Sequence, residues 1–531
     1  MNRQVLVVLI ALLLRFIYLF TFAKTLFFNT FSDGLYYHKW ALDIIAGHAP
    51  SPPFFMSPLY PYFIAFFYKL FGADQTLILF IQTLLDTGTT YLIYRIGSSL
   101  WGERAGLIGS IIYAIGPIPI FYSGLFLMPT LLTFILTLGL WVIATRRDPF
   151  WAGLIFGIGV IGRGTILIPA LVPLFYLRKL RYLIGLALPI LLLFVINLGI
   201  GGTPVPTTYN FGINLYIGNN PRADGTYRRP PGLDLIHDPD GRKVIGQKLG
   251  KAVTPLESSR YWSGLAFDYI QRNPIQALFL LMRKFYLFWG PLEVLQLENI
   301  YYVLDRSFLK FLPMRIWLII PLFLTSLLAL SRRTRWLSLI ALFYSLSLLP
   351  FFIIGRFRAA INPIIVLTGG ALIDRLIAKR GRIGVFNLIL LLSLLICYIF
   401  LRIYGNDTIK EWIIETRCDR AYWTYLNDHP WAFQDSTRAI LRENPDCIIA
   451  LDNLGGYYFC IGEFELAREY LHRALALNPQ DGVAIYNLAL LYLRLNKPDS
   501  ALYYLKKARR LMPFNYRIEP MMRSAQRLLT P

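Results

Sequence analysis

Long apolar runs alternate with short basic segments over the first three quarters of the chain. Eleven runs rich in Leu, Ile, Phe and Val are long enough, or nearly so, to cross a lipid bilayer as helices. Their expected bounds, to within a few residues, are 5–22, 76–94, 105–121, 129–144, 150–161, 165–176, 183–198, 316–330, 337–354, 361–373 and 383–401. The pattern predicts an all-α fold with a polytopic membrane domain over residues 1–404.

Basic residues cluster in the short segments between alternate runs. They are Arg95, Arg104, Arg146, Arg147, Arg178, Lys179, Arg181, Arg332, Arg333, Arg335, Arg375, Lys379, Arg380 and Arg382. With the N-terminus in the cytoplasm, all these loops face the cytoplasm, as the positive-inside rule requires. We therefore expect an inner-membrane protein whose outer loops, 24–74 and 199–313, and C-terminal tail lie outside the cytoplasm. The first run lacks a small-x-small cleavage site, so we expect it to be retained.

The tail follows a different pattern, a repeat of 34 residues marked by Pro445, Pro479 and Pro513. The pairs in phase include Tyr458 with Tyr492, Ala467 with Ala501, Tyr470 with Tyr504 and Ala474 with Ala508. This spacing is typical of tetratricopeptide repeats, in which small residues let two helices cross and aromatic rings fill the gap. It predicts a helical repeat domain over 405–531, with clear repeats at 445–478 and 479–512. Two repeats are too few for stability, so residues 420–444 are expected to add a helix pair or a cap.

The repeats leave two roles open. Tetratricopeptide repeats bind peptides or partner proteins on a concave face, and the tail could equally be a spacer that stabilises the membrane domain.

Composition agrees with a membrane protein. Hydrophobic residues make up 56% of the 531 residues and charged residues 16%, so lipid must solvate much of the apolar surface. The net charge of +22 is explained by the cytoplasmic loops, which argues against nucleic-acid binding. Cys397 lies in an apolar run. Cys418, Cys447 and Cys460 lie in the tail, where either one disulfide forms or all three stay unpaired.

The first outer loop holds the leading catalytic candidate, Asp33. Apolar residues over 35–45 recur at helical spacing and predict a helix on the membrane surface. Asp33 directly precedes this helix, so its carboxylate either caps the helix or acts as a general base.

Three arginines on the outer side depart from the charge rule: Arg163, Arg356 and Arg358. A cation at this depth is costly unless it is paired. Guanidinium groups match the oxygens of a lipid-linked phosphate or pyrophosphate; the alternative is that they reach ordinary lipid headgroups.

The second outer loop supplies further candidates. Asn210, Asn214 and Asn219 lie in a segment of amides, glycines and aromatic residues that suits a sugar-binding wall or a tight turn. Glu293 and Glu298 face the same compartment and could assist Asp33. The sequence has no metal-ligand spacing and no phosphate-binding glycine loop, so we expect no metal or cofactor and no nucleotide-sugar donor.

Several of these segments, taken in chain order, resemble glycosyltransferase family 39. They are Asp33, Pro58-Leu59-Tyr60-Pro61, Gly162-Arg163, the stretch from Asn210 to Pro221, and the stretch from Arg356 to Pro363. That family has the GT-C fold and includes protein O-mannosyltransferases and the lipid A aminoarabinose transferase. The resemblance covers roughly residues 1–400 and is closest to a bacterial branch with a tetratricopeptide tail.

The resemblance implies a sugar donor linked to polyprenyl phosphate and a transfer that inverts the anomeric carbon. The acceptor would be a hydroxyl of a protein, lipid or glycan. Asp33 would take the acceptor proton, the three arginines would stabilise the departing lipid phosphate, and Tyr60 would contribute to substrate binding. Family members need no metal as a rule.

One departure from the family concerns its second acidic residue, since residues 122–130 contain no carboxylate. Glu293 or Glu298 replaces it, Asp33 works alone, or the chain has lost activity. Two other functions stay open: a polysaccharide polymerase or ligase that uses lipid-pyrophosphate donors, and a non-catalytic scaffold with a repeat docking module. A transporter is disfavoured because no apolar run shows a buried charged pair near its centre.

Overall fold

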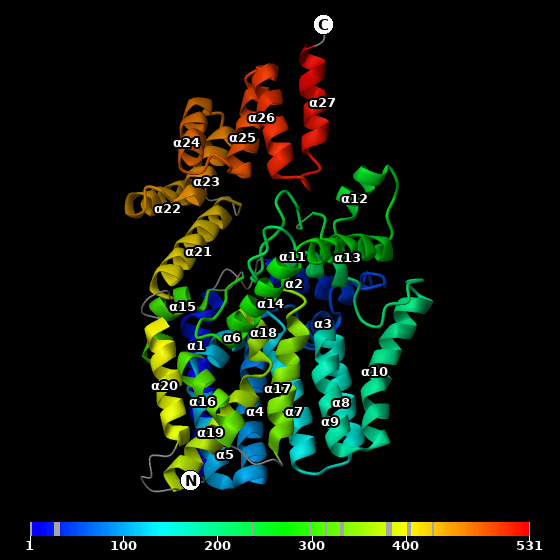
Figure 1. The fold of residues 1–531 in the computed structure, drawn as a ribbon, viewed down its shortest axis with the longest axis vertical. Coiled ribbons are helices and arrows are strands. Elements are labelled where there is room, and N and C mark those ends of the chain that lie inside the picture. Colours follow the sequence, from blue (N-terminus) through cyan, green and yellow to red (C-terminus); the bar gives the residue numbers. More distant parts are fainter. Residues whose placement is uncertain are drawn as a thin grey trace. The chain divides into compact units, whose positions relative to one another are not determined.

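The computed structural model describes residues 3–25, 32–235, 237–296, 299–313, 316–329, 334–378, 385–400, 405–426 and 430–529. These residues form helices joined by loops, with no β-strand among them, which confirms the all-α class. The chain divides into two compact units (Figure 1). The membrane unit comprises Met1–Tyr227 and Ser263–Asn406, and the repeat unit comprises Arg228–Trp262 and Asp407–Pro531.

The helices of the membrane unit run mostly along one direction (Figure 1). They are α1 (Arg3–Thr21), α2 (Ser32–Ile45), α3 (Leu59–Phe71), α4 (Gln75–Trp101), α5 (Glu103–Ala114), α6 (Pro117–Ser123), α7 (Pro129–Ala144), α8 (Pro149–Gly162), α9 (Leu167–Leu177), α10 (Leu180–Gly199), α11 (Phe211–Gly218), α14 (Pro274–Trp289), α15 (Ile300–Arg306), α16 (Ile316–Ala329), α17 (Arg335–Leu348), α18 (Gly355–Ala359), α19 (Asn362–Ala378) and α20 (Val385–Phe400). Helix α13 (Pro255–Arg272) begins in the repeat unit and ends in the membrane unit.

Each of the eleven expected spans coincides with one helix or a pair of helices, but the count of eleven spans is not confirmed. Among the described residues, only Arg3–Thr25, Gln75–Trp101 and Leu180–Gly199 are long and apolar enough to cross a membrane unaided. Helices α5 and α6 pass the same test together, although they are bent by 57° at the break between them. Helix α3 was not expected from the sequence, since residues 59–71 were predicted to belong to the outer loop 24–74.

Close helix packing in the membrane unit depends on glycines at contact points. Gly153 on α8 lies against the carbonyl of Tyr182 on α10, and Gly185 on α10 lies against the carbonyl of Phe150 on α8. A β-carbon at either glycine would overlap that backbone, so the two helices approach only because both positions lack a side chain. The outer face of α10 exposes Leu192 and Val195 by 63% and 61%, as expected for a surface solvated by lipid.

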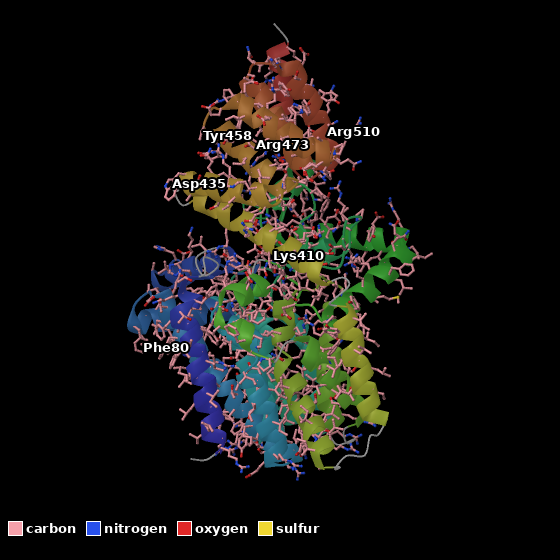
Figure 2. All side chains as sticks on the ribbon, turned by 90° about the vertical axis from the view of Figure 1, so that its left-hand side faces the viewer. Phe80, Lys410, Asp435, Tyr458, Arg473 and Arg510 are labelled. Carbon is pink, nitrogen blue, oxygen red and sulfur yellow. The ribbon has the colours of Figure 1, made fainter. Side chains whose placement is uncertain are left out.

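The repeat unit contains α12 (Arg242–Leu249), α21 (Asn406–Leu426), α22 (Pro430–Glu443), α23 (Ile448–Cys460), α24 (Phe464–Leu477), α25 (Gly482–Arg494), α26 (Pro498–Leu511) and α27 (Ile518–Leu529). The predicted 34-residue period is visible in its packing. Tyr458 stacks on Tyr470 with ring centroids 5.5 Å apart, and Tyr492 stacks on Tyr504 at 5.4 Å. Figure 2 labels Tyr458 in this unit. Helices α21 and α22 precede the first repeat, and Phe433 of α22 is buried in the same core as Leu454.

Residues 228–262, which the sequence analysis assigned to the second outer loop, group with the repeat unit. Asp234 pairs with Arg517 at 2.9 Å, and the rings of Trp262 and Phe514 lie 5.3 Å apart. The indole nitrogen of Trp262 donates to the carbonyl of Asp240 at 3.0 Å. The repeat unit is therefore built from two segments of the chain.

Candidate active site

The candidate site begins at the first turn of α2, where Asp33 meets an arginine from α18. Oδ2 of Asp33 lies 2.8 Å from Nη1 of Arg356, and the two side chains are 26% and 14% exposed. Nη2 of Arg356 also donates to Oε1 of Gln296 at 2.7 Å. Helix α2 begins at Ser32, so Asp33 lies inside the first turn and not before the helix as expected. The carboxylate of Asp33 therefore pairs with a guanidinium group that is distant in the sequence.

Tyr37 follows Asp33 by one turn of α2 and is influenced by three of the charges selected from sequence. Burial raises the pKa of the Tyr37 phenol, and Asp33 raises it further, whereas Arg356 and Arg163 lower it. The charges of Asp33, Arg163 and Arg356 therefore all act on the pKa of one buried phenol. Tyr37 was not among the residues predicted from the sequence, although its position one turn after Asp33 was a usable signal.

Tyr60 is fully buried and lies next to Tyr37. Its ring packs edge to face against Tyr37 with centroids 5.1 Å apart. Its hydroxyl donates to Oε1 of Gln82 at 2.5 Å, and Nε2 of Gln82 donates to the carbonyl of Leu125 at 2.7 Å. Tyr60 thus supports the ring of Tyr37 from the protein interior.

Arg163 follows the end of α8 and is held by two groups from α17 and α18. Its guanidinium lies 4.3 Å from the ring centroid of Phe357, and Nη1 donates to the hydroxyl of Tyr344 at 2.8 Å. That hydroxyl in turn donates to the carbonyl of Phe357 at 2.9 Å. Among the described residues, none of the ion pairs found involves Arg163. Its positive charge is therefore positioned by neutral groups.

Arg358 is buried, and its partner is the carboxylate of Glu293. Nη2 of Arg358 lies 3.0 Å from Oε2 of Glu293, and each side chain is 4% exposed. Nη1 and Nη2 also donate to the carbonyls of Gly290 and Leu292 at 2.9 and 2.5 Å. The structure therefore separates the three arginines: Arg356 pairs with Asp33, Arg163 stacks on Phe357, and Arg358 pairs with Glu293.

Glu293 also contacts residues 122–130, the segment in which the resembled family has a second acidic residue and this chain has none. The hydroxyl of Tyr122 donates to Oε1 of Glu293 at 3.0 Å. A β-carbon at Gly355 would overlap the same carboxylate, so the close approach of Glu293 to α18 requires glycine there. Glu298 lies outside the described residues.

The asparagines of the second outer loop differ in surroundings. Asn210 precedes α11 and accepts from the hydroxyl of Thr208 at 3.0 Å, and Asn214 is half-buried one turn later. Asn219 is buried; its Nδ2 donates to the carbonyl of Pro350 at 2.6 Å, and its Oδ1 accepts from Nζ of Lys284 at 3.1 Å. In the described part of the chain, no three His, Cys, Asp or Glu side chains are grouped to hold a metal ion.

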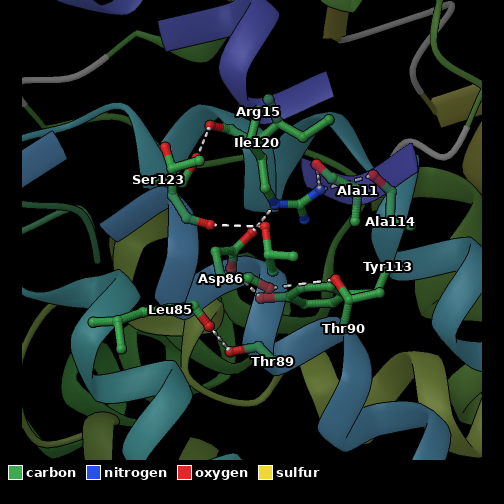
Figure 3. A network of polar contacts seen from close by, with 12 residues as sticks. Ala11, Arg15, Leu85, Asp86, Thr89, Thr90, Tyr113, Ala114, Ile120 and Ser123 are labelled. Atoms are coloured by element: carbon green, nitrogen blue, oxygen red, sulfur yellow. Dashed lines mark hydrogen bonds and ion pairs between the residues drawn. The ribbon is translucent and has the colours of Figure 1, made fainter. Parts of the chain in front are cut away.

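The sequence argument against a transporter assumed that no expected span holds a buried charged pair. This assumption is wrong, because Arg15 and Asp86 form such a pair inside two expected spans (Figure 3). Nε of Arg15 lies 2.5 Å from Oδ2 of Asp86, and the side chains are 0% and 3% exposed. Nη1 of Arg15 donates to the carbonyls of Ala11 and Ala114, and the hydroxyl of Tyr113 donates to Oδ1 of Asp86 at 2.6 Å. Because Ala114 ends α5, the guanidinium holds a carbonyl at the break between α5 and α6.

Comparison with known proteins assigns two segments of the chain to families. Residues 52–200 match the family of dolichyl-phosphate-mannose-protein mannosyltransferases, and residues 446–513 match tetratricopeptide repeats. The resemblance to the mannosyltransferase family is therefore confirmed for part of the membrane unit, which contains a glycosyltransferase-family segment. The prediction of repeats in the tail is confirmed. A search of curated protein sequences found no match.

Among solved structures, the chain is similar to the oligosaccharyltransferase of Archaeoglobus fulgidus. The match to its complex with an inhibitory peptide and a dolichol-phosphate has 13% identity and a TM-score of 0.36, covering 80% of this chain and 58% of that chain. The match to its complex with zinc and sulfate has 15% identity and a TM-score of 0.38, covering 80% and 55%. The chain thus spans little more than half the length of these structures.

Proposed function

We propose that this chain is an inverting glycosyltransferase that moves a sugar from a polyprenyl-phosphate donor to an acceptor hydroxyl at the outer face of the inner membrane. The observation that carries the proposal is the contact between Asp33 and Arg356, with Arg163 stacked on Phe357, the residue that follows Arg356. A carboxylate can serve as the general base of this reaction, and two guanidinium groups can bind the leaving phosphate. The family match over residues 52–200 supports the class of reaction.

In the proposed reaction, Asp33 accepts the proton of the acceptor hydroxyl as its oxygen bonds to the anomeric carbon of the sugar. The bond between that carbon and the phosphate oxygen breaks on the opposite face, which inverts the configuration. Arg356 and Arg163 stabilise the negative charge on the departing lipid phosphate. Arg356 pairs with Asp33 in this structure, so a donor phosphate that engages Arg356 would release the carboxylate for its role as base.

Glu293 has a supporting role in this proposal. Its contacts with Arg358 and Tyr122 join α18 to the end of α6, and α18 also carries Arg356. Glu293 therefore takes the place of the missing second acid as a positioning residue. The sidedness rests on the basic loops, which place the N-terminus in the cytoplasm and the repeats outside. The repeats would bind the acceptor or a partner protein.

The role of Glu293 is tested against Glu298, the other acid that the sequence offers. Glu293→Gln should lower the turnover of sugar transfer by about 10²-fold. Arg358 loses its counter-charge, and the resulting shift of α18 displaces Arg356 on the same helix. The effect of Glu293→Gln should fall on kcat more than on KM for the donor. Glu298→Gln makes the same chemical change at the other acid and should lower turnover less than Glu293→Gln. The reverse order of the two effects would assign the role to Glu298.

The class of donor is tested with purified protein in lipid nanodiscs. A sugar carried on polyprenyl monophosphate should be transferred to acceptor peptides or glycans, and the product should have the inverted anomeric configuration by nuclear magnetic resonance. The same sugar on polyprenyl pyrophosphate should give no product. Transfer from the pyrophosphate alone would support the polymerase or ligase alternative, and no transfer from either donor, with correctly folded protein, would support the scaffold.

A further inference from the structure

Two cysteines of the repeat unit lie side by side in its interior. Sγ of Cys418 on α21 is 3.7 Å from Sγ of Cys447, the residue that precedes α23. The two residues are 0% and 8% exposed, and they share an apolar cluster with Ile440 and Ala450. The sulfurs are not bonded in this structure, but they are in contact, and their separation exceeds the length of a disulfide bond by only about 1.7 Å.

The surroundings of the pair favour the chemistry of disulfide formation. Cys447 stands at the N-terminal end of a helix, where the helix dipole stabilises a thiolate. The hydrogen bond with Cys418 lowers the pKa of the Cys447 thiol further, despite the opposing effect of burial. Cys447 is thus the nucleophile of the pair, and Cys418 is the thiol placed to resolve it.

We infer that Cys418 and Cys447 form a structural disulfide that ties α21 to the start of α23, the first helix of the repeats. The inference depends on the proposed placement of the tail outside the cytoplasm, where disulfides persist, and does not depend on sugar transfer. It selects one pairing from those that the sequence left open and leaves Cys460, which is exposed at the end of α23, as the remaining thiol.

The bond would form by exchange with the disulfide of a thiol-oxidising protein while the unit is still folding. The Cys447 thiolate attacks one sulfur of that disulfide, and the other sulfur leaves as a thiolate. The Cys418 thiol then loses its proton to solvent and attacks Sγ of Cys447, which releases the oxidant as a dithiol. The two cysteines lose two electrons and two protons, and the oxidant gains them.

The bond is tested by differential alkylation of the full-length protein in cells that produce it. Free thiols are trapped with N-ethylmaleimide in denaturant, disulfides are then reduced, and the released thiols are labelled with iodoacetamide. Peptide mass spectrometry should find Cys418 and Cys447 carrying the second label in most molecules and Cys460 carrying the first. Cys418 and Cys447 labelled in the first step as completely as Cys460 would overturn the inference, as would a bond to Cys460.

Two variants assign the pairing. Cys418→Ser should move Cys447 to the first label, whereas Cys460→Ser should leave the labels of the other two cysteines unchanged. If Cys418→Ser does not accumulate, the labelling of the unaltered chain and of Cys460→Ser still decides the question. The transferase proposal has a separate readout, since the sugar-transfer assay is run on the same preparation. A Cys418–Cys447 disulfide in protein that transfers no sugar would contradict only the proposed function.

Discussion

Replacement of Asp33 by Asn should lower the rate of sugar transfer by a factor on the order of 10²–10⁴, the usual contribution of a general base. The amide keeps the shape of the carboxylate but cannot accept the acceptor proton, and it loses the charge that pairs with Arg356. The loss should appear in kcat, because donor phosphate binding through Arg163 and Arg356 stays intact. The measurement is the turnover of purified variant and unaltered protein with the same polyprenyl-monophosphate donor.

Asp43 provides a matched control for this experiment. It lies on the same helix, α2, and its side chain is exposed. Asp43→Asn makes the same chemical change ten residues away and should leave transfer and yield as they are. A transfer rate for Asp33→Asn that equals that of Asp43→Asn would remove Asp33 from the mechanism, and with it the proposed reaction.

Loss of the buried guanidinium of Arg15 should have the largest effect on stability. Arg15→Met leaves Asp86 charged in the interior, where the hydroxyl of Tyr113 is then the one side-chain donor to it among the described residues. Breaking one side of a buried pair costs about 3–5 kcal/mol, a large share of the roughly 5–15 kcal/mol that stabilises a typical protein. The expected result is a marked fall in the yield of monodisperse protein and in its thermal unfolding temperature in detergent.

The double variant Arg15→Met with Asp86→Leu separates charge from packing. It removes both charges and replaces them with apolar groups of similar volume, which is often neutral for a buried pair. Its unfolding temperature should therefore lie above that of Arg15→Met. If the double variant is as unstable as the single one, the pair acts through the carbonyl of Ala114 and the bend of the α5–α6 span, and not through charge compensation.

The parts of the fold that a local pattern determines could be predicted from the sequence. The 34-residue period placed Tyr458 and Tyr492 in equivalent positions, and both rings make the same stacking contact. Each apolar run forms one helix or a pair of helices. The number of membrane crossings was less accessible, because helices such as α8, with 14 residues, are only about 21 Å long against an apolar bilayer core of about 30 Å.

Features that depend on pairing between distant residues could be predicted only in part. Asp33 and Arg356 were each selected for their chemistry, but nothing in the sequence gave their contact. Arg15 and Asp86 were each visible as single charges within apolar runs, and such charges are almost always paired, so the signal was present and was not used. The assignment of residues 228–262 to the repeat unit had no local signal, since Asp234 and Trp262 find their partners only in the folded chain.

The two-segment origin of the repeat unit bears on how the protein can be divided. A chain that begins at Asp407 carries all the repeats but lacks the residues that contact Arg517 and Phe514. A soluble fragment for binding studies therefore needs residues 228–262 as a separate peptide or a grafted linker. By the same reasoning, cleavage between α20 and α21 would not release the tail. Residues 228–262 complete the repeat unit and stay covalently joined to the membrane unit, so their contacts would retain the tail.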